Sequence, residues 1–313
     1  MTMVERLGRW RDEGVITPAQ FERLGAIVRK DRFSVSLELN ALLYLGVLSI
    51  AAGLLWTVRT HFADLGDSAV VLALSAIVAV CVWYCFSRAR PYSSGEVESP
   101  TAIFDYVLYL GCLVFAIELA FVEMRFALLK DAWDSYVLVS AAVFFAAAYR
   151  FDNRFVLSLA LSTLAAWFGI RLSRFGFGSA DSLRASALVY GALVAGTGIA
   201  LQRLTIKPHF VETHLHVAAT AAFVALTSGV TSANTGFFYL FGLLTLAVIS
   251  IAYGIRRREF AFVAYGAVYP YVGISLKLVQ SLSVTTTMAY GVVSGTAMVI
   301  VVVYVARRFG RDA

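Results

Sequence analysis

Ten long apolar stretches run along this 313-residue chain, and they leave few folds open to it. A helix needs roughly 20 apolar residues to cross a hydrocarbon core about 30 Å thick, and nearly every stretch has that length. The stretches are continuously apolar, whereas strands of a membrane barrel alternate apolar and polar residues. We therefore expect an all-α fold, a polytopic membrane helix bundle of about ten transmembrane helices. The expected spans are residues 39–58, 67–87, 102–122, 135–149, 154–172, 183–203, 212–230, 235–255, 259–279 and 284–306.

The distribution of positive charge predicts an orientation. Only 15% of the residues are charged, against about 25% in soluble domains, yet the net charge is +6. Of the 26 Lys and Arg residues, 19 lie in the first 36 residues, near residues 88–90, 150–154, 203–207 and 256–258, or after the last span. Because cytoplasmic loops collect Lys and Arg, both termini are expected to be cytoplasmic. The basic charge is thus a topology signal. The lipid bilayer is the expected partner, and no nucleic acid is expected.

Residues 1–36 are polar and are expected to form a small cytoplasmic helical hairpin. Gly14 suits the left-handed position that ends a helix over residues 3–13, and Thr17 with Gln20 predicts a capping box that starts a second helix over residues 18–30. So short a hairpin has little core of its own. Residues 3–31 are therefore expected to pack on the membrane domain, on a second copy in a homo-oligomer, or on a protein partner. A DNA-binding helix-turn-helix is disfavoured, because the second helix lacks a clear polar readout face.

The same segment carries a family resemblance. The run from Trp10 to Leu24, with Gly14-Val-Ile-Thr17 and Gln20 inside it, precedes a span that contains Leu45-Gly46 and Ala52-Gly53. This arrangement resembles a bacterial family of predicted multi-pass membrane proteins catalogued as a domain of unknown function. The resemblance is clear over residues 3–90. It implies a location in the bacterial cytoplasmic (inner) membrane and implies no activity.

The chain also shows signs of an internal repeat. At a shift of 104 residues, Ala148-Tyr149 recurs as Ala252-Tyr253 and Gly169-Ile170 recurs as Gly273-Ile274. Shared use of small and aromatic residues in membrane helices is the alternative explanation. A duplication would give like-oriented copies, as in parallel-repeat transporters. The expected domains are 1–36, the cytoplasmic hairpin; 37–90, a first transmembrane hairpin; 102–203, one four-helix repeat; and 207–307, the second four-helix repeat.

Ionisable groups inside spans are expensive to bury and are candidate binding groups. Glu118 is the one carboxylate well inside an expected span, and Arg171 and Lys277 lie at the outer ends of two others. Pairing of Glu118 with either cation would reduce the cost of burial and form an outward-facing pocket for an anionic or zwitterionic ligand. Pro270 lies in mid-span and should kink its helix. Kinked or interrupted helices are found at many transport sites. The alternative for the cations is snorkelling to the interface.

A possible metal site lies where the seventh span begins. His209, Glu212 and His216 share one helix face at i, i+3 and i+7, and imidazole and carboxylate groups are metal ligands. The spacing matches no known zinc signature, so an interfacial turn with hydrated histidines is the alternative. The sequence also lacks nucleotide-binding and hydrolase motifs. We therefore expect no catalytic residue and no cofactor.

Two classes of function follow. The first is a transporter or binder of a small or lipid-like solute, with a site between the repeats near Glu118, Arg171, Lys277 and Pro270. The alternative is a membrane scaffold or envelope-stress partner without catalytic activity, which acts through the N-terminal hairpin. A membrane enzyme would need the face of His209, Glu212 and His216 to bind metal.

Overall fold

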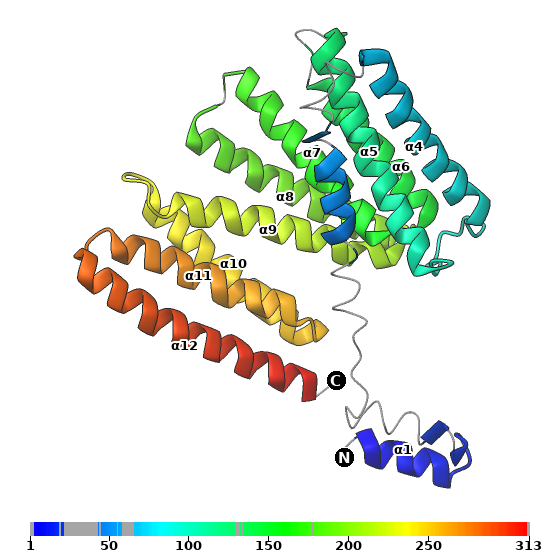
Figure 1. Ribbon diagram of the computed structural model, residues 1–313. Coiled ribbons are helices and arrows are strands. Elements are labelled where there is room, and N and C mark those ends of the chain that lie inside the picture. The colour runs from blue at the N-terminus through cyan, green and yellow to red at the C-terminus, as the bar shows by residue number, and fades with distance from the viewer. Residues whose placement is uncertain are drawn as a thin grey trace. The chain divides into compact units, whose positions relative to one another are not determined.

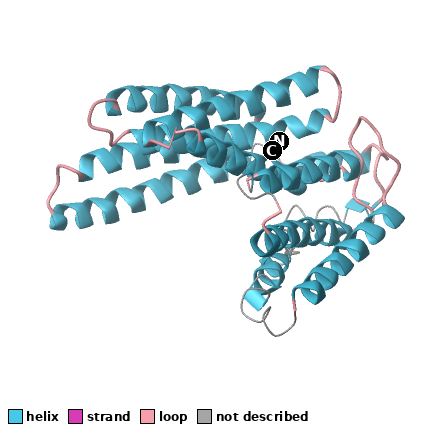
Figure 2. Cartoon of the chain, turned by 90° about the horizontal axis from the view of Figure 1, so that it is seen from above, coloured by secondary structure: helices cyan, strands magenta, loops and turns pink. Residues whose placement is uncertain are grey.

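The computed structural model describes residues 3–18, 20–21, 43, 45–54, 56–57, 66–128, 132, 134–176 and 178–311. It divides into two compact units, Met1–Gly66 and Asp67–Ala313. All regular structure in the described residues is helical, with no strand among them (Figure 2). The predicted all-α class is therefore confirmed.

The first unit opens with helix α1, Met3–Asp12. Gly14 takes the left-handed conformation with φ 72°, as predicted. The capping box is also present, because Thr17 N donates to Gln20 Oε1 at 2.8 Å and Gln20 N donates to Thr17 Oγ1 at 3.3 Å. Most of the predicted second helix lies outside the described residues. An apolar helix, Leu45–Leu54, falls within the expected first span.

The second unit contains nine α-helices in its described residues (Figure 1). Seven of these nine helices are long by themselves, α9 forms a long span together with the 3-10 turn that precedes it, and α6 is shorter. Eight are long and apolar enough to cross a membrane, and the shorter α6 and Leu45–Leu54 lie at the positions of the other two expected spans. The elements are α4 Asp67–Arg88, α5 Ala102–Phe126, α6 Ser135–Phe151, α7 Arg154–Arg174, α8 Ala180–Arg203, η2 Pro208–Phe210, α9 Val211–Gly229, α10 Gly236–Arg257, α11 Phe260–Val279 and α12 Val284–Arg311.

Consecutive helices pack as close pairs, α4 with α5, α6 with α7, α8 with α9 and α10 with α11, and α12 lies along α11 (Figure 1). Small residues stand where the paired helices meet. A Cβ on Gly111 would lie 2.9 Å from the Cys81 Cβ, and one on Gly191 would lie 3.0 Å from the Ala218 carbonyl oxygen. Each pair is joined through residues 89–101, 152–153, 204–210 or 258–259. We call the end of the unit that carries these four connections the arginine-rich end.

Two of the connections have the same backbone conformation. Asp152 and Arg258 both take the left-handed conformation with φ 58°, and their N–H groups donate to Ala148 O and Gly254 O. These positions are 106 residues apart. Six buried positions of α6 and α7 correspond to buried positions of α10 and α11 at the same separation. They are Ala141 and Ala247, Phe144 and Ser250, Ala148 and Gly254, Val156 and Phe262, Leu157 and Val263, and Ala160 and Gly266.

The structural correspondence therefore differs by two residues from the 104-residue shift seen in the sequence. At that shift, buried Ala148 would correspond to Ala252, which is exposed. The turn fixes which residues of the two helices meet, whereas identities among small apolar residues do not. The structure matches the two helix pairs in position, and a duplication of the chain remains a prediction.

Candidate functional site

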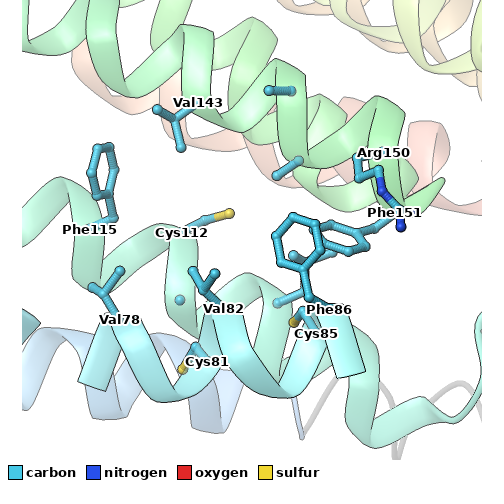
Figure 3. Close-up of a pocket in the computed structure, with 14 residues that line it drawn as sticks. Val78, Cys81, Val82, Cys85, Phe86, Cys112, Phe115, Val143, Arg150 and Phe151 are labelled. Atoms are coloured by element: carbon cyan, nitrogen blue, oxygen red, sulfur yellow. The ribbon is translucent and has the colours of Figure 1, made fainter. Parts of the chain in front are cut away.

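An apolar groove of about 410 Å³ lies between α4, α5 and α6 (Figure 3). Its lining is almost entirely apolar, and the three cysteines Cys81, Cys85 and Cys112 contribute to it as free, buried thiols. Arg150 is the one charged residue in the lining. It lies with Phe151 at one end of the groove, and Phe115 lies toward the other end (Figure 3). We call this cavity the first groove.

Arg150 is held at the arginine-rich end of the first groove by aromatic and backbone contacts. Its guanidinium lies 5.6 Å from the Phe86 ring centroid and 5.3 Å from that of Phe151. Its Nη1 donates to Arg90 O at 3.3 Å. Because a guanidinium has five N–H donors in a planar fork, it suits the recognition of carboxylate or phosphate oxygens. The first groove thus has an apolar lining and one cation, held in place at one end.

A second groove of about 370 Å³ is built in the same way by α8, α9 and α10, with Phe262 of α11. Its lining includes Ser250 and Tyr253 and no charged residue. The two grooves are lined by equivalent positions of their helices. This correspondence matches α4–α7 with α8–α11. Each matched set begins one helix before the expected repeat, because those repeats were residues 102–203 and 207–307. The matched lining residues are Cys81 and Gly191, Cys85 and Ala195, Gly111 and Ala218, Cys112 and Ala219, Val143 and Ile249, and Ala147 and Tyr253.

A buried ion pair fixes the arginine-rich end. The side chains of Lys207 and Asp152 are 1% and 2% exposed, and Lys207 Nζ lies 2.8 Å from Asp152 Oδ2. Lys207 Nζ also donates to Gly95 O at 3.0 Å, and Val97 N donates to the same Asp152 oxygen at 2.5 Å. His209 Nε2 lies 2.5 Å from Asp152 Oδ1. These contacts join three of the four connections, so this cluster holds helix pairs together.

Close to this cluster, three potential metal ligands converge. One ligand atom from each of Glu212, His216 and Glu259 lies within 4.8 Å of the other two. Burial raises the pKa of the Glu259 carboxyl above its ordinary value, and the Glu212 carboxylate raises it further, while His216 and Arg257 oppose the shift. The arrangement gathers two carboxylates and an imidazole on the α9–α11 side of the arginine-rich end.

Two of the three predicted metal ligands therefore meet, and the third does not. His209 faces Asp152, whereas Glu259 stands beside Glu212 and His216. The physical reason is a competing partner. His209 lies in the 3-10 turn η2, ahead of α9, and its Nε2 lies 2.5 Å from Asp152 Oδ1, so the ring belongs to the ion-pair cluster and not to the pair of Glu212 and His216. Glu259 was missed because its neighbours Arg256, Arg257 and Arg258 suggested only a basic loop.

The predicted ligand-binding residues are not brought together. Glu118 accepts a short hydrogen bond from Ser75 of α4, and Arg171 Nη1 lies 3.3 Å from Asp134 Oδ2, in a cluster that also contains Arg174. Among the ion pairs of the described residues, Glu118 is joined to neither Arg171 nor Lys277. Asp134, 1% exposed, is the carboxylate that Arg171 requires, and it was missed because it lies in a loop.

The other two predicted residues lie away from both grooves. Lys277 is exposed at the end of α11, opposite to the arginine-rich end. Pro270 is buried inside α11, which continues through it from Phe260 to Val279. Neither residue lines a groove. The sequence singled out residues of unusual type, whereas the grooves are formed by ordinary small and apolar residues.

Comparison with known proteins agrees with this architecture. Residues 8–157 match the model of a protein family described as "Predicted membrane protein (DUF2157)". The match confirms the resemblance seen in the sequence to membrane proteins of a domain of unknown function, and it spans the whole of the first groove. No curated protein and no solved structure matches the chain. The protein is therefore membrane-embedded, and its helices contact the bilayer.

Proposed function

We propose that this protein binds an anionic, lipid-like amphiphile in the first groove, and that it carries out no catalysis. The observation that supports this most directly is the lining of the groove, which is apolar throughout except for Arg150 at one end. An acyl chain suits the apolar part of the groove, because its burial there removes apolar surface from water and leaves no polar group unpaired. A phosphate or carboxylate head group fits the guanidinium, which offers charge-assisted hydrogen bonds.

The position of Arg150 also agrees with the expected topology. The arginine-rich end carries the loops with most of the Lys and Arg residues, so by the positive-inside rule it faces the cytoplasm of a bacterial inner membrane. The anionic lipids of a bilayer attract basic groups at that surface. We infer that the head group of the ligand lies in the cytoplasmic leaflet, with its chain in the groove.

The preference for an anionic head group is tested with Arg150→Gln. Binding of a phosphatidylglycerol and a phosphatidylcholine of equal chain length to the purified protein in detergent is compared by native mass spectrometry. Wild-type protein is expected to prefer phosphatidylglycerol. In the variant, the ratio of the two lipid affinities should fall about tenfold, since a charge-assisted hydrogen bond contributes about 1.5–3 kcal/mol. Arg203→Gln, an exposed arginine at the same end and outside the groove, is the matched control. An unchanged preference in Arg150→Gln would contradict the proposal.

Occupation of the groove by the chain is tested with Ala146→Trp. Ala146 lines the first groove and is exposed within it, so an indole there should occlude it. Both lipids should then bind more weakly. Ala142→Trp places the same side chain at an exposed position of α6 that does not line the groove, and it should leave binding unchanged. Equal effects of the two substitutions would show that the lipid binds elsewhere on the surface.

The inferred orientation is tested by fusing green fluorescent protein to the C-terminus. Because this reporter fluoresces when it folds in the cytoplasm and not after export through the general secretory route, a fluorescent fusion is expected. A second fusion truncated after Arg174, at the opposite end of α7, should be dark. The reverse pattern would overturn the orientation and place Arg150 in the other leaflet.

A further inference from the structure

One of the polar contacts in which the matched halves of the unit differ lies between the second and fourth helices, at the arginine-rich end. In α4–α7, Asp105 near the start of α5 faces Asn153 at the start of α7, and Asn153 Nδ2 donates to Asp105 Oδ1 at 2.8 Å. Ser99 Oγ donates to the same oxygen at 2.7 Å. The single carboxylate of this contact is thus satisfied by neutral donors.

In α8–α11 the corresponding positions hold Glu212 and Glu259. Asp105 and Glu212 are 107 residues apart, as are the matched groove residues of α5 and α9. Asn153 and Glu259 are 106 residues apart, as are the two matched turns. Where the first half has a hydrogen-bonded carboxylate and amide, the second half has two carboxylates, which repel each other unless a proton or a cation lies between them. Unlike Asn153, Glu259 does not cap its helix, so its side chain is available to face Glu212.

Neighbouring cations satisfy this pair only in part. Arg154 Nη1 lies 3.0 Å from Glu212 Oε2, and its Nη2 lies 3.1 Å from Glu96 Oε1, so it binds the Glu212 oxygen that faces away from His216. Arg257 is near enough to Glu259 to affect its pKa. Even so, Glu259 Oε2 is buried and has no hydrogen-bond partner in the part of the chain that the structure describes.

His216 supplies a third donor atom, and its ring is held in place. Its Nε2 lies 4.0 Å from Glu212 Oε1. Its Nδ1 lies 3.4 Å from Tyr265 Oη, and the ring stacks on Phe262 with centroids 4.7 Å apart. Histidine ligands of metals are commonly oriented in this way by a hydrogen bond to the other ring nitrogen.

We propose that Glu212, His216 and Glu259 bind a divalent transition-metal ion, with Zn²⁺ as the best match. Zn²⁺ takes imidazole nitrogen and carboxylate oxygen at about 2.0–2.2 Å, whereas Ca²⁺ and Mg²⁺ prefer sets made of oxygen alone. Three atoms within 4.8 Å of one another need only small side-chain movements to reach one ion. The ion would link α9 to the start of α11 and neutralise the two carboxylates. This site is separate from the first groove and does not depend on lipid binding.

Calorimetric titration of the purified, tag-free full chain with ZnCl₂ tests the site. Wild-type protein is expected to bind one equivalent. Glu259→Gln and His216→Gln should each bind at least about tenfold more weakly, because loss of even an outer-shell partner costs about 10–100-fold. Tyr265→Phe, which keeps all three ligands, should lose about tenfold by the same reasoning. Glu98→Gln, at an 87% exposed carboxylate, is the control for non-specific binding.

Two further variants separate this site from its alternatives. His209→Gln should leave the affinity unchanged, because His209 faces Asp152. Loss of affinity in His209→Gln but not in Glu259→Gln would overturn the proposed ligand set. Failure of the wild-type protein to bind Zn²⁺ would overturn the site itself. Glu259→Asp, which keeps the charge and shortens the side chain, should give an intermediate affinity, and slow labelling of the buried thiols before titration confirms that each variant is folded.

Discussion

Replacement of Lys207 by Met is expected to lower the free energy of unfolding by about 3 kcal/mol. Methionine keeps most of the apolar stem and removes the ammonium group. Asp152, 2% exposed, would then keep its charge without its buried cation, and such uncompensated charges cost about 3–5 kcal/mol. We expect the lower end of that range, because His209 and the Val97 N–H still contact the carboxylate.

The three buried cysteines provide the measurement. A thiol-reactive fluorophore labels Cys81, Cys85 and Cys112 only as heating exposes them, so its signal follows unfolding of the second unit. A loss of about 3 kcal/mol should lower the midpoint by roughly 6–12 °C in a unit of this size. Lys277→Met, at an exposed lysine, should stay within about 0.5 kcal/mol of wild type.

A double-mutant cycle shows whether the ion pair itself is responsible. Asp152→Asn removes the charge and keeps a residue type that tolerates the left-handed conformation with φ 58°. In the double variant with Lys207→Met, the loss in free energy of unfolding should be smaller than the sum of the two single losses, because no unpaired charge is left. Additive effects, or a midpoint for Lys207→Met equal to that of wild type, would show that the pair does not hold the arginine-rich end together.

The helices of this protein could be predicted from its sequence because lipid imposes so simple a rule. Every backbone polar group must be satisfied within the membrane, so a long apolar run is a helix. The expected span 154–172 corresponds to α7, Arg154–Arg174, and the capping box at Thr17 and Gln20 forms as expected. These features depend on neighbours in sequence alone.

The candidate sites depend on contacts between helices, and the sequence predicts these poorly. Arg171 was one of the two cations considered as partners of Glu118, yet it contacts Asp134, a loop residue with no periodic pattern to mark it. Glu259 gave no signal of its own. Only the position of the turn at Arg258, which puts it opposite Glu212, makes it a candidate ligand. The grooves were missed because helix pairing, not residue type, creates them.

Gly254→Ala is expected to destabilise the unit by about 2 kcal/mol, against the usual preference of helices for alanine. The added Cβ would lie 2.7 Å from Val263 Cγ2, 2.9 Å from Glu259 O and 3.0 Å from Val263 N. Two of these atoms belong to the backbone, so the contact is relieved only by separating α10 from α11, and thiol labelling should show a lower midpoint.

The same substitution in α12 should have the opposite sign. Apart from its own helix backbone, no atom of the described residues lies within 4 Å of a Cβ added at Gly291, so Gly291→Ala gains only the helix preference of about 0.5–1 kcal/mol. The position that matches Gly254 in the other half is Ala148, which is fully buried and has room for its methyl group. The α10–α11 pair is therefore the more closely packed of the two. Equal responses to Gly254→Ala and Gly291→Ala would contradict the close packing of Gly254 against α11.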